Sequence, residues 1–107
     1  MIIVKYIIEV EVIYLVADFK IVCKIHDSRE VITQVGVQEG DSTYAYNVID
    51  IVNRILDKKH RYYTDKRGSL VWVYAKKHPY SGRWFLTTKP DSARENNLDF
   101  LPKCVLR

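Results

Sequence analysis

The chain has 107 residues, of which 48% are hydrophobic and 28% are charged, with four glycines and three prolines. This composition predicts one folded domain spanning residues 1–107 that buries roughly two thirds of its surface, and it excludes a disordered chain. Seventeen Lys or Arg residues against thirteen Asp or Glu residues give a formal net charge of +4.

The charge is distributed unevenly along the chain. Residues 1–50 carry four Lys or Arg and eight Asp or Glu, which gives −4, whereas residues 51–107 carry thirteen and five, which gives +8. Two explanations fit this division. Either an anionic partner binds the basic half, or the two halves associate in a self-complementary way, and charge alone does not choose between them.

Residues 2–16 contain no Gly, Pro, Asn or Asp and are rich in Ile, Val and Tyr, which predicts a long strand. Lys5, Glu9 and Glu11 fall between apolar residues there, as on a strand with one wet face. These charges, the short length and the lack of a cleavage site argue against a membrane helix and a signal peptide, so we expect a cytoplasmic protein. In a monomer, such a strand would leave an unpaired sheet edge that tends to associate with another chain. This predicts a homodimer.

A β-hairpin is predicted next. Residues 19–26 and 30–38 are strand-like runs, and residues 27–29 read Asp-Ser-Arg between them. Short Asp and Ser side chains bond readily to the backbone of the residues that follow, which is typical of a turn.

Residues 44–59 predict the one helix of the chain. Their apolar members recur every three or four positions, at Ala45, Val48, Ile49, Val52, Ile55 and Leu56. The three residues before the helix are candidate N-caps, namely Asp41, Ser42 and Thr43. The apolar stripe of this helix requires a sheet to cover it.

The second half of the chain predicts further strands over residues 60–64, 69–76 and 83–88, with a turn over residues 65–68. In the tail, Leu98, Phe100 and Leu101 are candidate anchors that pack back onto the body. The resulting order β-β-β-α-β-β-β predicts an α+β fold, with a mostly antiparallel sheet and one amphipathic helix packed on one face.

Several short motifs of the chain occur together in a known family. They are Ile21-Val22, Val35-Gly36-Val37, Val48-Ile49-Asp50, Tyr62-Tyr63-Thr64, Arg83-Trp84-Phe85-Leu86-Thr87-Thr88 with Pro90-Asp91, and Asn96-Asn97-Leu98 with Leu101-Pro102-Lys103-Cys104. On these motifs the chain resembles, over residues 19–104, the family called domain of unknown function 3892. The residues before Phe19 are not part of that pattern. The resemblance implies a small α+β domain of unassigned function, and it supplies no catalytic residues.

Basic and aromatic residues alternate through the second half of the chain, from Lys58 to Trp84. Aromatic faces stack on bases and cations neutralise phosphates, so this pattern predicts a module that binds single-stranded DNA or RNA. Strand alternation places Trp72 and Tyr74 on the face opposite Val73. The candidate nucleic-acid-binding residues are Arg61, Tyr63, Lys66, Arg67, Trp72, Tyr74, Lys76, Arg83 and Trp84.

A second interpretation gives these aromatic side chains a structural role. Large aromatic residues usually mark packing, so the first strand, the tail or a second subunit would cover Trp72. The chain would then be a homodimeric structural or protein-interaction domain with no role in nucleic-acid binding.

No motif predicts an enzyme, a cofactor or a metal. His60 and His78 are the candidates for acid–base chemistry, but no pattern fixes their geometry. Cys23 and His26 would lie on opposite faces of a strand, which argues against a shared metal ion. Two cysteines are too few for a disulfide scaffold. We therefore expect Cys23 and Cys104 to be reduced and buried, with a single bridge between them as the alternative.

Overall fold

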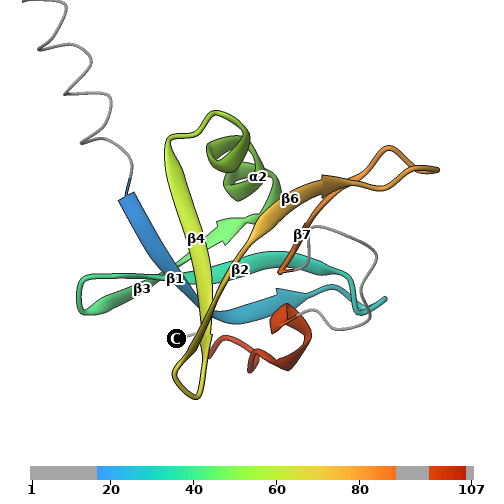
Figure 1. The fold of residues 1–107 in the computed structure, drawn as a ribbon. Coiled ribbons are helices and arrows are strands. Elements are labelled where there is room, and N and C mark those ends of the chain that lie inside the picture. The colour runs from blue at the N-terminus through green and yellow to red at the C-terminus, as the bar shows by residue number, and fades with distance from the viewer. Residues whose placement is uncertain (1–16, 89–96, 106–107) are drawn as a thin grey trace, which may run out of the picture.

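A five-stranded sheet in the order β3-β2-β1-β4-β5 is the centre of the computed structural model, which describes residues 17–88 and 97–105 (Figure 1). β1 pairs in parallel with β4, whereas the other strand pairs are antiparallel. The fold is α+β, as predicted, and the strand predicted over residues 2–16 lies outside the described residues. The elements are β1 (Ala17–His26), β2 (Ile32–Glu39), β3 (Ser42–Asn47), α2 (Val48–Leu56), β4 (His60–Lys66), β5 (Ser69–Trp72), β6 (Tyr74–Lys77), β7 (Trp84–Thr87) and the 3₁₀ helix η1 (Asn97–Phe100).

The first predicted hairpin is confirmed, and an Asp side chain holds its turn. The carboxylate oxygen Oδ1 of Asp27 accepts hydrogen bonds from the backbone N–H groups of Arg29 and Val31, at 2.9 and 3.1 Å. The bond from Val31, followed by that from Arg29, lowers the pKa of Asp27 because both stabilise the ionised carboxylate. The turn between β1 and β2 therefore follows from the local sequence.

The predicted start of the helix is wrong. Ser42–Asn47 forms β3, which pairs with β2, and α2 begins at Val48 and ends at Leu56. Thr43, Tyr44 and Tyr46 are residue types that suit a strand, and the edge of β2 that faces away from β1 supplies the partner. Tertiary pairing therefore overrides the helical spacing. The N-cap is Asn47 instead of a residue of 41–43. Its side-chain oxygen does not cap the helix, because it accepts a hydrogen bond from Nε2 of Gln34 at 3.1 Å.

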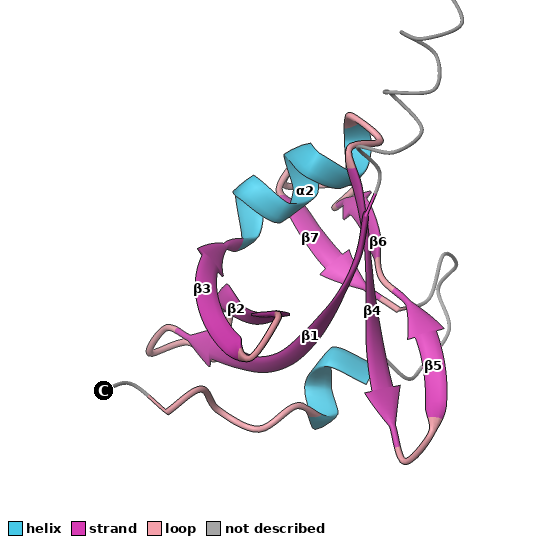
Figure 2. Ribbon diagram, turned by 90° about the vertical axis from the view of Figure 1, so that its left-hand side faces the viewer, coloured by secondary structure: helices cyan, strands magenta, loops and turns pink. Residues whose placement is uncertain are grey.

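The single strand predicted over residues 69–76 is also wrong, because the chain changes sheets at Val73. β5 pairs with β4, whereas β6 pairs with β7 in a separate two-stranded sheet. At the change, the Val73 N–H donates to the carbonyl oxygen of Tyr62 at 2.8 Å, and the Val73 side chain is buried. Figure 2 shows β6 and β7 beside α2, while the β4–β5 hairpin extends away from them.

The core forms between the sheet, the helix and the tail. Ile51 and Val52 of α2 are fully buried, whereas Ile49 and Leu56 of the predicted apolar stripe are 50% and 47% exposed. The tail packs onto the body as predicted through Leu98, but Phe100 is largely exposed. The buried hydrophobic cluster consists of Ile21, Val35, Val37, Ile51, Val52, Tyr62, Val73, Leu86 and Leu98.

Cys23 and Cys104 form a disulfide with an S–S distance of 2.05 Å, so the expectation of two reduced cysteines is wrong. The tail places them together, since Lys24 and Lys103 form a parallel β-bridge. Gly36 makes room for the bond: a Cβ at this position would lie 2.2 Å from Sγ of Cys23 and 3.0 Å from Sγ of Cys104. The pairing of residues 81 positions apart depends on the fold, and sequence spacing alone does not reveal it.

Candidate nucleic-acid interface

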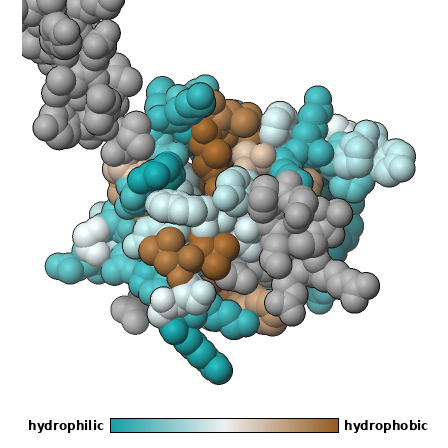
Figure 3. Space-filling model, viewed as in Figure 1, coloured by the Kyte–Doolittle hydropathy of each residue, from teal (hydrophilic) through white to brown (hydrophobic). Residues whose placement is uncertain are grey.

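A groove of about 460 Å³ lies where the end of α2 meets the start of β4 and the change from β5 to β6. Figure 3 shows an apolar patch at the level of α2, with hydrophilic side chains at its border. The groove combines apolar side chains, such as Ile55 and Val73, with the cationic groups of Lys58 and Arg61. Its lining residues are Ile55, Lys58, His60, Arg61, Trp72, Val73 and Tyr74.

Trp72 is the largest aromatic side chain of the groove, and two residues of β4 position it. The Arg61 guanidinium lies over the Trp72 ring, with its central carbon 4.6 Å from the ring centre. Tyr63, which is the cross-strand partner of Trp72, presents its ring at 79° with the centres 6.0 Å apart. Arg61 and Tyr63 are two residues apart and therefore share one face of β4. Alternation along β4 and its register with β5 thus build this aromatic–cationic cluster.

The orientation of Arg61 is fixed from β1. Its Nε and Nη2 atoms donate to the two carboxylate oxygens of Asp18 at 2.8 and 2.9 Å. Asp18 and Arg61 are direct partners in the parallel register of β1 and β4. Both side chains are about half exposed, so the pair stabilises the fold by less than about 1 kcal/mol. Its main effect is to hold the guanidinium plane against Trp72, while Asp18 offsets much of its charge.

Lys58 supplies the remaining formal positive charge at the groove. It follows the end of α2 with a positive φ of 57°, and its N–H donates to the carbonyl oxygen of Ile55 at 3.1 Å. Within the described part of the chain, Lys58 takes part in no ion pair. A cation at a helix C-terminus also suits the helix dipole. Its ammonium group is therefore available to an anion.

His60 forms part of the wall of the groove. Its ring packs edge-on against Phe19 and Tyr62, with ring centres 5.2 and 6.4 Å away. Among the described residues, its Nδ1 atom is the buried side-chain nitrogen or oxygen that has no hydrogen-bond partner. Burying a polar atom without a hydrogen bond costs free energy. The Nδ1 atom of His60 could therefore still form a hydrogen bond at the wall of the groove.

Arg54 lies near the groove on α2, but its contacts are internal. Its guanidinium carbon lies 4.5 Å from the centre of the Tyr46 ring, and its Nη1 donates to the Tyr62 hydroxyl at 3.4 Å. This bond to Tyr62 raises the pKa of Arg54. The Tyr46 hydroxyl donates to Oε1 of Glu39 at 2.5 Å, and this bond raises the pKa of Tyr46. This network connects α2 to β3 and β4. The Arg54 guanidinium is therefore occupied by Tyr46 and Tyr62.

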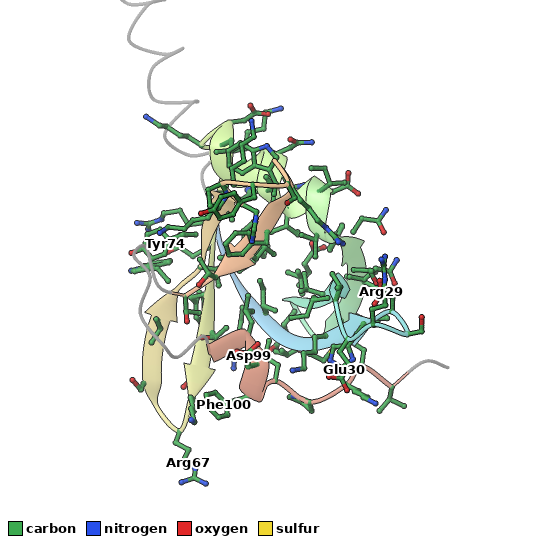
Figure 4. The ribbon with its side chains drawn as sticks, turned by 90° about the vertical axis from the view of Figure 1, so that its right-hand side faces the viewer. Arg29, Glu30, Arg67, Tyr74, Asp99 and Phe100 are labelled. Carbon is green, nitrogen blue, oxygen red and sulfur yellow. A yellow bond between two sulfur atoms is a disulfide. The ribbon has the colours of Figure 1, made fainter. Side chains whose placement is uncertain are left out.

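The structure brings together four of the nine predicted residues, namely Arg61, Tyr63, Trp72 and Tyr74. Figure 4 shows Arg67 at the tip of the β4–β5 hairpin, far from Tyr74 at the side of the molecule. Lys66, next to Arg67, places its Nζ 3.8 Å from the centre of the Phe100 ring. Lys66 and Arg67 therefore belong to the tip of the β4–β5 hairpin and not to the groove.

The other three predicted residues, Lys76, Arg83 and Trp84, lie on or beside the two-stranded sheet. Trp84 packs against the core and is partly buried, so it anchors β7. Arg83 precedes β7 and is exposed. None of these three lines the groove. The site prediction omitted Lys58, His60 and Ile55. The feature that could have identified them is their position at the junction of α2 and β4.

His78 takes part in the loop between β6 and β7. Its Nδ1 atom accepts hydrogen bonds from the N–H groups of Tyr80 and Ser81, both at 3.4 Å. Within residues 17–88 and 97–105, no group of three or more His, Cys, Asp or Glu side chains is placed to hold a metal ion. Over the same ranges, no helix is both long and apolar enough to cross a membrane.

Residues 20–102 match the family described as a protein of unknown function, DUF3892. Searches of curated proteins and of solved structures give no match.

Proposed function

The chain belongs to the DUF3892 family, whose function is unknown, and from the groove we propose that it binds single-stranded nucleic acid. The observation that carries this proposal is the Trp72 ring in a groove that also holds Arg61, Tyr74 and Lys58. Tyr63, which does not line the groove, packs against the Trp72 ring. Stacking and phosphate neutralisation are the two interactions by which proteins hold single strands.

The dimensions and chemistry of the groove suit an unpaired base. Its volume of about 460 Å³ lies within the range of roughly 300–1,000 Å³ that is usual for ligand sites. Stacking on an aromatic side chain contributes about 1–3 kcal/mol per base. Arg61 already holds Trp72 in place, so little ordering is needed when a base arrives. In a duplex the base faces are stacked on each other, and we therefore expect weak binding of duplex DNA.

The proposal is tested by fluorescence anisotropy of labelled single-stranded RNA, single-stranded DNA and duplex DNA, each titrated with the protein at two salt concentrations. We expect tighter binding of the single strands and a loss of affinity as salt rises, because released counterions favour the complex. Equal affinity for duplex and single strands would contradict base stacking.

A pair of matched variants tests the role of Lys58. Lys58→Gln and Arg67→Gln each remove one positive charge. The two residues have similar positive φ angles, 57° and 53°, so both variants place Gln in the same backbone conformation. Lys58→Gln should lower affinity severalfold and reduce the magnitude of the salt slope by about 0.7, the value for one phosphate of a single strand. Arg67→Gln should leave both quantities unchanged, because Arg67 lies outside the groove. Equal effects of the two variants would refute the assignment of the groove.

The alternative, a homodimeric interaction domain, depends on the strand predicted over residues 2–16, outside the described residues. Light scattering of the purified chain distinguishes a monomer from a dimer. A cytoplasmic location also stays a prediction. The disulfide between Cys23 and Cys104 weighs against it, because disulfides persist mainly in oxidising compartments.

A further inference from the structure

Residues 97–105, named here the C-terminal strap, occupy an edge of β1 that β4 leaves open. β4 pairs with residues 17–20 of β1, and the strap bonds farther along the same strand. The N–H of Lys24 donates to the carbonyl oxygen of Pro102 at 3.0 Å, and the N–H of Cys104 donates to the carbonyl oxygen of Lys24 at 2.9 Å. Figure 2 shows the strap running from η1 along β1.

The two ends of the strap are held in different ways. At the first end, the Leu98 side chain is fully buried in the core, and Nζ of Lys24 donates to the carbonyl oxygen of Asp99 at 2.7 Å. At the second end, the described contacts to β1 are the two backbone bonds of Lys24 and the disulfide of Cys104. The side chains of Pro102 and Lys103 between them are exposed. The second end therefore depends on the disulfide much more than the first.

The disulfide is accessible from solvent. A surface cavity of about 650 Å³ is lined by Cys23, Cys104 and Gly36, together with residues of β3. Cys23 is 8% exposed, and Cys104 is more exposed than Cys23. The main ladder from β1 to β2 does not involve the strap, and neither does the ladder from β2 to β3. Breaking the bond therefore leaves the sheet with its own hydrogen bonds.

We propose that the Cys23–Cys104 disulfide is a reversible redox clip, whose reduction releases residues 102–105 from β1 while Leu98 keeps the rest of the strap in place. This inference is independent of nucleic-acid binding. The two cysteines would act as a switch: their reduction would expose the backbone N–H and C=O groups of Lys24, which the strap otherwise covers.

The reductant is a small thiol. Its thiolate attacks the more exposed Sγ of Cys104, a mixed disulfide forms, and Cys23 leaves as a thiolate that takes up a proton. A second thiolate attacks the small-thiol sulfur of the mixed disulfide, so Cys104 also leaves as a thiolate and takes up a proton. Two electrons pass to the protein, and the two small thiols end as one disulfide.

Amide hydrogen exchange of the full chain tests the clip, with and without dithiothreitol. We expect the N–H groups of Lys24 and Cys104 to exchange at least about tenfold faster after reduction, because the disulfide no longer restrains local opening of this end. The N–H of Val73, bonded to Tyr62 in the body, should keep its rate. Reoxidation should restore the protection of Lys24 and Cys104.

Any of four results would overturn the proposal. Faster exchange at Val73 together with Lys24 would mean that reduction unfolds the domain and that the bond is only a structural staple. Unchanged protection of Lys24 and Cys104 would mean that the strap stays in place without the bond. Free thiols on both cysteines in air-oxidised protein, detected by alkylation, would mean that no clip forms. The variant Cys104→Ser should fold and exchange as the reduced protein does, and its failure to fold would equally contradict a clip.

Discussion

Replacing Tyr62 by Ala is expected to lower the free energy of unfolding by about 3–5 kcal/mol, as for other large aromatic residues removed from a core. Tyr62 is 1% exposed and is the largest fully buried side chain among the described residues. Its ring packs beside Phe19 and His60, with centres 5.9 and 6.4 Å away. Equilibrium denaturation in urea measures the loss.

Tyr62→Phe is the control for this variant, because it removes the hydroxyl and keeps the ring. The hydroxyl accepts a bond from Arg54 that is long, at 3.4 Å, so its loss should cost no more than about 1 kcal/mol. Equal losses for Tyr62→Phe and Tyr62→Ala would contradict the packing account and point to the polar network of α2 as the dominant interaction.

Replacing Leu98 by Ala is expected to cost about 2–5 kcal/mol, because this side chain of the tail is fully buried in the core. The matched control is Phe100→Ala, two residues along the same 3₁₀ helix. Phe100 is 57% exposed and contacts Lys66, so its removal should cost about 0.5–1 kcal/mol. Both variants are compared by denaturation with the disulfide intact. A Leu98→Ala loss no larger than that of Phe100→Ala would show that the tail does not complete the core.

Local sequence rules account for the parts of the fold whose partners are near in the chain. The turn at Asp27 is an example, since the side chain bonds to amides two and four residues ahead. The β4–β5 hairpin is another, because its turn includes Gly68 with a positive φ of 86°. Those rules fail where a distant partner decides. Tyr44 and Tyr46 lie in a strand because β2 offers them an edge. After Val73 the chain leaves β4 and pairs with β7 instead.

The same distinction applies to the candidate site. The interleaving of basic and aromatic residues includes Arg61, Tyr63 and Trp72 among the candidates, and the register of β4 with β5 brings these three together. Charge and aromatic content were not enough to exclude Arg67 and Trp84. They do not reveal that Arg67 lies at the tip of the hairpin, away from the groove, or that Trp84 is partly buried against the core. The wall supplied by α2 depends on how the helix packs, so Lys58 was not selected from sequence. The disulfide depends likewise on the path of the tail past Gly36.

The most direct test of the proposed function uses the fluorescence of Trp72. The chain has two tryptophans, so Trp84→Phe leaves Trp72 as the single one. Titration of this variant with an unlabelled single-stranded oligonucleotide at low salt should quench Trp72, because a base stacks on its ring. The same oligonucleotide annealed into a duplex should quench it much less. Binding detected by anisotropy with no change in Trp72 fluorescence, or no binding of single strands at low salt, would contradict the groove as a nucleic-acid interface.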